Sequence, residues 1–229
     1  MEKKEFLINR RRVLLLKSGM PQVILIQPIS WLETQHALQV ADLIARQTNQ
    51  PFVMAAFDIK DWERELTPWE DAMISRRNSV NGGGAEETLG YVLDNLLPWL
   101  QARYASRVPV VLGGYSLGAL FSLWASSLSD CFAAIAACSP SLWMRDWLTF
   151  AEAHPVKAQH VYLSLGEREE RSKNQVMARV GDCVRTEYEL LKKTLNPDHT
   201  ILYWEQGGHF TDVAGRTARG FSWCVTRFV

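Results

Sequence analysis

The residues with the clearest chemical signal form a serine motif that directly follows an apolar run. Residues 108–112 lead into Gly-Gly-Tyr-Ser-Leu-Gly at 113–118, and the last five of these match the pattern Gly-x-Ser-x-Gly. A serine nucleophile needs this setting, because a tight turn between a strand and a helix leaves its hydroxyl free above the sheet. Chance would produce roughly 0.1 such matches in a chain of this length. The motif therefore predicts Ser116 as a nucleophile that attacks a carbonyl carbon.

A general base is expected downstream of Ser116, because hydrolases with this turn place their partners in the order Ser, then Asp or Glu, then His. Four histidines follow the serine. Three of them flank strands or end a helical segment, whereas His209 lies in Gly-Gly-His after the last apolar run and directly before the last helical pattern. Two glycines allow a loop to curl over the sheet edge toward the serine. His209 is therefore the predicted base.

The acid is expected after the apolar run 161–165, where the chain reads Gly-Glu-Arg-Glu-Glu-Arg. Three glutamates compete, namely Glu167, Glu169 and Glu170. Hydrolases that carry their serine on a turn of this kind commonly place the acid about three residues beyond the glycine that ends the strand. This habit of other hydrolases, rather than the spacing here, favours Glu169. Glu167 and Glu170 stay open as alternatives.

Two backbone N–H groups are needed to hold the negative charge that develops on the carbonyl oxygen. The first is predicted at Leu117, the residue after the nucleophile. The second is expected in the loop after the run 23–26, which reads Gln-Pro-Ile-Ser. Proline has no N–H, so Ile29 is the first choice and Ser30 the second.

Tryptophans in two long loops are candidates for a substrate pocket. Trp62 and Trp69 follow an apolar run whose end should face the site, and Trp143 lies in the loop after the run 133–137. Packing beneath a long loop is the competing explanation for each of them. The sequence has no phosphate-binding glycine loop, dinucleotide motif or metal-ligand spacing, so no cofactor and no metal are expected.

The elements that would position these residues alternate between strand and helix. Short apolar runs are typical of strands buried on both faces, and they occur at 13–16, 23–26, 52–56, 108–112, 133–137, 161–165 and 201–204. Helical spacing of apolar residues appears between them, at 37–44, 89–100, 176–191 and 214–228. Only six residues separate the first two runs, which favours an antiparallel hairpin. The pattern predicts an α/β fold, with a hairpin leading into a mostly parallel sheet that carries helices on both faces.

Length and composition are compatible with one domain over residues 1–229. The 25 basic and 25 acidic residues cancel, so no global field would attract nucleic acid or an anionic membrane. No segment approaches the apolar length of a membrane span, and the N-terminus does not resemble a signal peptide. The four cysteines are widely spaced, so free thiols in a reducing cytoplasm are the simplest expectation. The oligomeric state stays open.

Several of these segments resemble the esterase D-like "putative esterase" family of α/β-hydrolases. The resemblance runs from about residue 23 to the C-terminus and is carried by the serine motif, Ser-Pro-Ser-Leu-Trp at 139–143, Ser-Leu-Gly-Glu at 164–167 and Gly-His at 208–209. It implies a triad of Ser116, His209 and a glutamate near Gly166, with the 139–143 loop beside the serine. The chain departs from many members by having Gln-Pro at 27–28 in place of His-Gly.

The leading hypothesis is therefore a serine hydrolase that cleaves a small carboxylic ester through an acyl-enzyme. An acyltransferase would use the same triad and is not separable by sequence. A non-catalytic binding protein on the same fold is the alternative from another class, because fold does not fix function.

Overall fold

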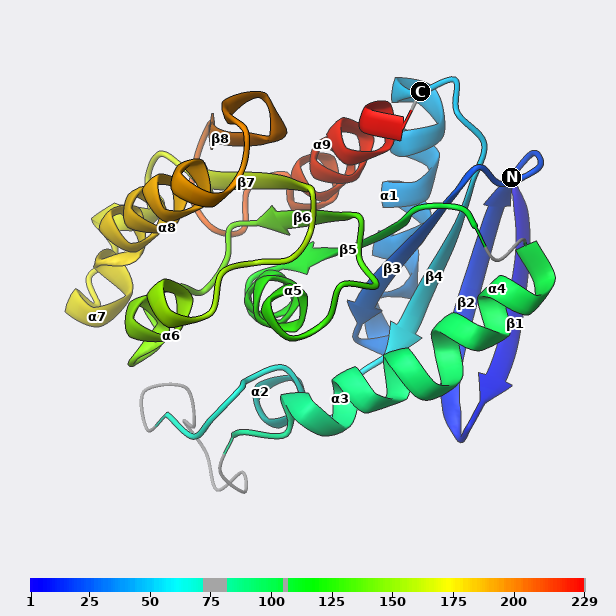
Figure 1. Ribbon diagram of the computed structural model, residues 1–229, viewed down its shortest axis with the longest axis horizontal. Helices are drawn as coiled ribbons and strands as arrows, with labels where there is room; N and C mark the ends of the chain where they lie inside the picture. The colour runs from blue at the N-terminus through cyan, green and yellow to red at the C-terminus, as the bar shows by residue number, and fades with distance from the viewer. Residues whose placement is uncertain (72–81, 105–106, 229) are drawn as a thin grey trace.

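The computed structural model describes residues 1–71, 82–104 and 107–228. These residues build an eight-stranded sheet in the order β1-β2-β4-β3-β5-β6-β7-β8 (Figure 1). β1 pairs with β2 and β2 with β4 in antiparallel fashion, and every later pair is parallel. The strands are β1 (Glu2–Ile8), β2 (Arg11–Ser18), β3 (Val23–Ile29), β4 (Phe52–Asp58), β5 (Val110–Tyr115), β6 (Ala134–Cys138), β7 (His160–Gly166) and β8 (Thr200–Glu205).

Helices cover both faces of the sheet. Two of them, α1 (Thr34–Gln47) and α9 (Val213–Val225), lie together on one face (Figure 1). The opposite face is covered by α3 (Ala85–Tyr91), α4 (Leu97–Tyr104), α5 (Leu117–Leu128), α6 (Trp147–Ala153) and α8 (Val180–Thr194). Two single-turn helices, α2 (Trp62–Glu65) and α7 (Gln175–Ala178), lie in the loops after β4 and β7.

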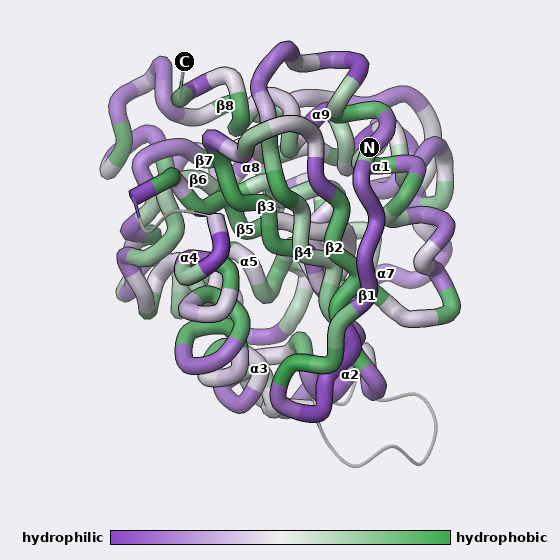
Figure 2. Tube along the Cα trace, turned by 90° about the vertical axis from the view of Figure 1, so that its right-hand side faces the viewer, coloured by the Kyte–Doolittle hydropathy of each residue, from purple (hydrophilic) through white to green (hydrophobic). Residues whose placement is uncertain are grey.

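Each face of the sheet has its own apolar core, because successive side chains of a strand point to opposite sides. In β3, Ile24 and Ile26 join the core beneath α3 to α8, whereas Val23 and Leu25 join the core beneath α1 and α9. Figure 2 shows the same organisation as continuous hydrophobic strands in the middle of the molecule. Burial on both faces explains why the central strands are mostly apolar rather than alternating.

The seven apolar runs all form strands, and the α/β architecture predicted from them is confirmed. An antiparallel hairpin exists at the start of the chain, but it is not formed by the two strands predicted from the runs 13–16 and 23–26. β2 pairs with the unpredicted β1, while β3 lies on the far side of β4 and runs parallel to it. β1 escaped the pattern search because its residues Glu2–Ile8 are mostly charged and exposed, as suits a strand at the edge of a sheet.

The helical stretch that contains Pro98 is divided into three parts. α3 passes into a π-helical turn at Val92–Leu96, and α4 then begins at Leu97. Proline has no N–H for the helix interior. The wide turn just before it adjusts the hydrogen-bond ladder at this point.

All four cysteines are free, and Cys138, Cys183 and Cys224 are buried as expected. Within the described ranges, no helix is both long enough and apolar enough to cross a membrane.

Candidate active site

Ser116 occupies a sharp turn between β5 and α5. Its backbone has φ 57° and ψ −118°, a conformation that side-chain-bearing residues rarely adopt. The turn is held at both ends: the Ser116 amide donates to Cys138 O at 3.1 Å, and the Ser116 carbonyl accepts from the amides of Ala119 and Leu120. Strain of this kind persists only where the surroundings enforce it, which is typical of functional sites.

The two glycines of the motif allow the turn to close. A Cβ atom placed on Gly114 would come within 2.9 Å of the carbonyl carbon of Gly118. A Cβ atom on Gly118 would lie 3.3 Å from Pro28 Cγ and 3.7 Å from the ring of Trp62. The strand and the helix can therefore pack this closely only because Gly114 has no side chain, which is the steric reason for the spacing in the sequence.

His209 and Glu169 come together from two different loops. Glu169 begins a single 3-10 turn after β7, at Glu169–Arg171, and His209 lies between β8 and α9. His209 Nδ1 lies 2.6 Å from Glu169 Oε2, and the carboxyl group is almost fully buried. The other carboxylate oxygen, Oε1, accepts from the Gly166 amide at 2.8 Å and from Ser139 Oγ at 2.7 Å.

These contacts favour the ionised carboxylate. Burial opposes ionisation of Glu169, but the hydrogen bond and charge of His209, with the bonds from Ser139 and Gly166, outweigh it and hold the pKa of Glu169 below its ordinary value. The two alternative glutamates lie elsewhere: Glu167 is exposed beside Arg168, and Glu170 pairs with Arg185 at 2.8 Å. Of the three candidates, Glu169 is the one that the structure brings to His209.

The Ser116 hydroxyl opens into a cleft that it shares with His209. Ser116 Oγ lies 3.2 Å from Ser141 Oγ, on the loop after β6, so the 139–143 loop does lie beside the serine. Among the described residues, the hydroxyl pairs with Ser141 rather than with His209. Hydrogen bonds between nucleophile and base are often loose in the absence of substrate and tighten when it binds.

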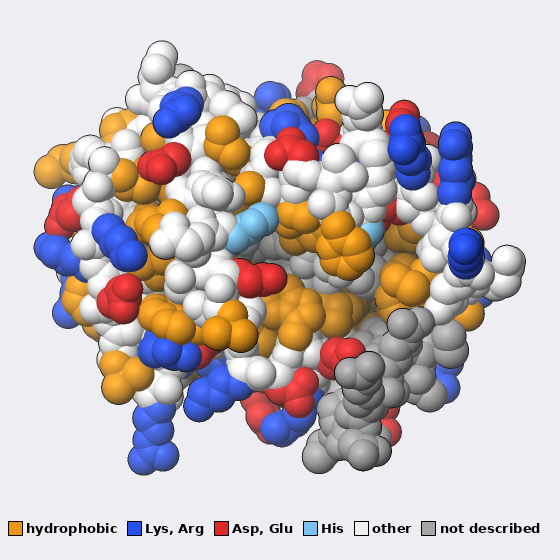
Figure 3. Space-filling model, turned by 180° about the vertical axis from the view of Figure 1, so that it is seen from behind, with side chains coloured by type: hydrophobic (Ala, Val, Ile, Leu, Met, Phe, Trp, Pro, Cys, Tyr) orange, Lys and Arg blue, Asp and Glu red, His pale blue; other side chains and the backbone are white. Residues whose placement is uncertain are grey.

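Two adjoining cavities meet at this pair. The larger has a volume of about 620 Å³, and the smaller measures about 220 Å³. Ser116, Met177, His209 and Phe210 line both. On the face drawn in Figure 3, hydrophobic side chains gather around a hollow that also shows histidine. His36 of α1 also lines the larger cavity, and burial lowers its pKa.

The Leu117 amide is free to hold an oxyanion, because it has no acceptor among the described residues and starts α5. The second predicted donor is placed differently. The Ile29 carbonyl accepts from the Ile59 amide at 2.8 Å, on the β4 side of β3. In a planar trans peptide the next N–H points the opposite way, so the Ser30 amide faces the side of β5 and Ser116. Within the described chain it has no acceptor.

The extended backbone of β3 sets these directions. The strand, which includes Pro28, stays extended through Ile29, so the N–H of Ile29 points with its carbonyl toward β4. The proline itself costs no ladder bond, because the pairing of β3 with β5 ends at Ile26 and Leu112.

The three tryptophans predicted to line the pocket lie in different places. Trp62 lines the larger cavity and Trp143 the smaller one. Trp69 is not among the residues described as lining either cavity; its ring packs on Phe150, and its Nε1 donates to Arg145 O at 2.8 Å. Across the described residues, no group of three His, Cys, Asp or Glu is arranged to hold a metal ion.

The family model described as "Putative esterase" matches residues 9–210. The chain belongs to this family. It is accordingly a carboxylesterase-type hydrolase. A search of curated proteins found no match.

Solved structures show the same fold at low sequence identity. An IroE-like serine hydrolase from Shewanella oneidensis superposes with a TM-score of 0.80 at 16% identity, covering 100% of this esterase and 81% of that chain. Siderophore hydrolase EstA from Aspergillus nidulans gives 0.67 at 17% identity, with coverages of 96% and 91%. The enterobactin esterase FES from Shigella flexneri gives 0.70 at 16% identity and covers 100% of this chain, which spans 60% of that one.

Sequence patterns alone missed four polar residues of this esterase. Ser139 and Ser141 lie in the loop that the family resemblance had highlighted, but no rule assigned them a role. Tyr115 is a variable position of the serine motif. Arg216 lies on α9 among the apolar residues from which the helix was predicted. Nothing in the sequence indicates that this arginine is buried.

Proposed function

We propose that this esterase hydrolyses small carboxylic esters through an acyl-enzyme on Ser116, with His209 as general base and Glu169 as its acid partner. One observation carries the proposal: the buried contact between Glu169 and His209 ends in the cleft that holds Ser116. The strained turn at Ser116, with a free amide at Leu117, supports it.

The contact with Glu169 sets which ring nitrogen faces the serine. Nδ1 of His209 donates to the carboxylate, which leaves Nε2 to take the proton of Ser116 Oγ. Ser116 Oγ then bonds to the ester carbonyl carbon, and the resulting oxyanion is held by the amides of Leu117 and Ser30. His209 returns the proton to the leaving alcohol as the carbon–oxygen bond breaks. A water molecule, deprotonated by His209, releases the acid and restores the serine.

The shape of the cleft supports a small ester with apolar groups. The larger cavity has walls from Pro28, Ile59 and Trp62, and the smaller one is lined by Pro140 and Trp143. Since the two cavities meet at Ser116, an ester bound there can place its acyl part on one side and its alcohol part on the other. The larger cavity also has polar walls from Glu33, His36 and Lys60. Cavities of this size that combine apolar walls with polar groups are typical of small-molecule sites.

The test is hydrolysis of a short-chain nitrophenyl ester, combined with labelling by a fluorophosphonate probe. Ser116→Ala should lose on the order of 10⁴-fold in kcat and all labelling, and His209→Ala should lose a similar factor. The double variant should be little worse than either, because the two residues act as a unit. Ser127→Ala, on the same helix and bonded to Leu123 O, is the control that should behave like the parent.

Two results would reject the proposal. One is a Ser116→Ala protein with parental turnover. The other is labelling of a different residue in the parent enzyme.

A further inference from the structure

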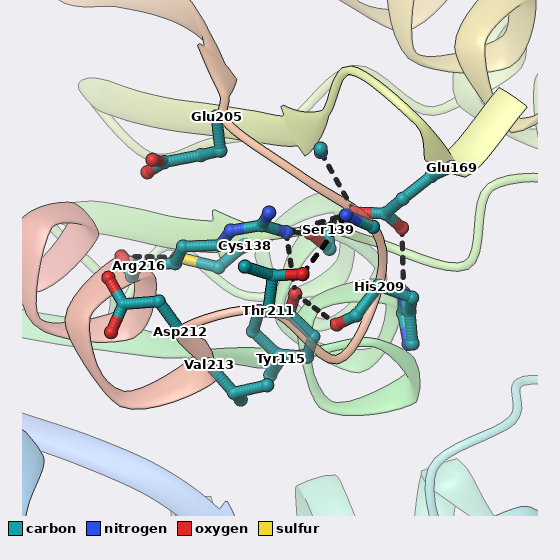
Figure 4. Close-up of polar contacts among 12 residues, drawn as sticks. Tyr115, Cys138, Ser139, Glu169, Glu205, His209, Thr211, Asp212, Val213 and Arg216 are labelled. Carbon is teal, nitrogen blue, oxygen red and sulfur yellow. Dashed lines mark hydrogen bonds and ion pairs between the residues drawn. The ribbon is translucent and has the colours of Figure 1, made fainter.

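A buried arginine contacts Glu169 directly and is connected to His209 through a tyrosine hydroxyl. Arg216 projects from α9 and is fully buried. Its Nη1 lies 3.2 Å from Glu169 Oε1 and 3.0 Å from the hydroxyl of Tyr115 (Figure 4). Its Nη2 donates to the carbonyl of Gln206 at 2.7 Å. Burying a guanidinium is costly unless its donors are satisfied. These partners come from three other parts of the chain, so the arginine joins them at one point.

Tyr115 carries the connection on to the histidine. Its hydroxyl accepts from Arg216 and donates to the backbone carbonyl of His209 at 2.7 Å. Burial raises the pKa of Tyr115 to about 12, so the hydroxyl keeps the proton that it donates. The Tyr115 ring also lies against the imidazole, with centroids 5.2 Å apart. Arg216 thus touches the carboxylate directly and the histidine backbone through one hydroxyl.

The end of β7 packs closely against the contact between Arg216 and Glu169. A Cβ atom on Gly166 would come within 2.9 Å of Arg216 Nη1, 2.8 Å of Glu169 Oε1 and 2.6 Å of the carbonyl oxygen of Gly207. Only a glycine at this position leaves room for the guanidinium and the carboxylate where they lie. A packed charge with fixed partners can hold two loops in one arrangement.

We propose that Arg216 is a positioning residue that fixes Glu169 and the His209 loop relative to each other and offsets part of the charge of the carboxylate. This inference rests on the proposed function. It assigns a role to a residue that touches neither the nucleophile nor the cavities.

The charge has a consequence for the pH profile. A cation at 3.2 Å from Glu169 weakens the attraction of the Glu169–His209 pair for a proton. Removing the cation should therefore favour a proton on the Glu169–His209 pair and lower the activity at acidic pH. Among the described residues, Tyr115 from β5 contacts His209, and Glu33, His36 and Lys60 line the larger cavity together with His209.

The experiment compares Arg216→Met, Arg216→Lys and Arg219→Met. Arg219 is the control, because it lies on the same helix and pairs with buried Glu205 at 2.9 and 2.7 Å and with Asp212 at 3.3 Å. Among the described residues it has no hydrogen bond or ion pair with Glu169 or His209. Folding is checked by thermal unfolding, and kcat/KM for the nitrophenyl ester is measured from pH 4 to 9. Ser116→Ala, which loses turnover at every pH, distinguishes a failure of the proposed function from a failure of this inference.

We expect Arg216→Met to lower kcat/KM about tenfold at the optimum pH. The acidic limb of the pH profile, where kcat/KM falls as the pH is lowered, should move to a pH about one unit higher. Arg216→Lys should keep the acidic limb of the parent, since it retains the charge. Arg219→Met should lower stability and leave the pH profile unchanged.

Tyr115→Phe keeps the inference testable if Arg216→Met does not fold. It removes the hydroxyl between the guanidinium and His209 but retains the cation, so kcat should fall while the acidic limb stays in place. The inference is overturned if a folded Arg216→Met enzyme keeps the parental limb, if Arg219→Met shifts it equally, or if Tyr115→Phe has parental kcat.

Discussion

Glu169 Oε2 lies 2.6 Å from His209 Nδ1, and this contact connects the loop after β7 to the loop before α9. Replacing the carboxylate with an amide keeps the shape of the side chain but removes the charge that orients and stabilises the imidazolium. We expect Glu169→Gln to lower kcat by about a thousandfold or more. Steady-state hydrolysis of the nitrophenyl ester measures the loss.

Glu167→Gln and Glu170→Gln are the matched controls for this prediction, because Glu167 is exposed and Glu170 is a half-buried residue that pairs with Arg185 rather than with His209. Each should stay within a few-fold of the parent, since exposed ion pairs contribute little. If one of these variants were crippled and Glu169→Gln were active, the acid would have to be assigned to that position.

Ser30→Pro tests the second oxyanion donor by removing one N–H. The φ of Ser30 is −75°, which proline adopts without strain, and the amide has no acceptor among the described residues, so the fold should tolerate the change. We expect kcat to fall by about 100-fold or more, the loss typical of one missing donor. Ser30→Ala retains the amide and should keep parental kcat. Parental activity in Ser30→Pro would return the assignment to Ile29.

Gly114→Ala should damage the turn that carries Ser116. The added Cβ would come within 2.9 Å of Gly118 carbonyl carbon, and backbone cannot move away as easily as a flexible side chain. Overpacking of this kind costs about 1–3 kcal/mol in the free energy of unfolding, which urea denaturation would measure. Gly90→Ala in α3 is the control: its nearest neighbour would be 3.9 Å away, so the helix should gain up to about 1 kcal/mol. Equal effects of the two variants would contradict the steric explanation.

Glu187 on α8 should make stability depend on pH. It is buried and accepts one hydrogen bond from Trp147 Nε1 at 3.0 Å, and burial raises its pKa from 4.5 to about 7. Between these two values the folded protein holds a proton that the unfolded chain has released, so stability falls as pH rises through this window. Glu187→Gln removes this loss and should stabilise the protein by about 3 kcal/mol at pH 8, with little gain at pH 4.5.

Urea unfolding at both pH values checks the Glu187 prediction. Glu189→Gln, an exposed residue of the same helix that pairs with Lys192, should change neither value. A Glu187→Gln gain that is the same at pH 4.5 and pH 8 would show that burial of the carboxylate is not its cause.

Local sequence patterns were enough to predict every described strand except β1, and also the serine turn. Apolar runs such as 161–165 reveal strands because both faces of each one are buried, and that property is written in consecutive residues. The turn at Ser116 is equally local, since the two glycines that must approach each other are four positions apart. His209 was predictable from its place after the last strand, but its partner was only narrowed to three glutamates.

The contacts between polar side chains in the site depend on tertiary packing. Glu169 and His209 are 40 positions apart, and Arg216 and Tyr115 are 101 apart, so their contacts depend on how loops and helices pack across the sheet. The position of β2 between β1 and β4 likewise depends on the order of the strands in the sheet. The direction of the Ser30 amide depends on β4 lying on one side of β3 and β5 on the other. Hydrogen-bond partners across a sheet are set by strand order and peptide orientation, and neither leaves a periodic signal along the chain.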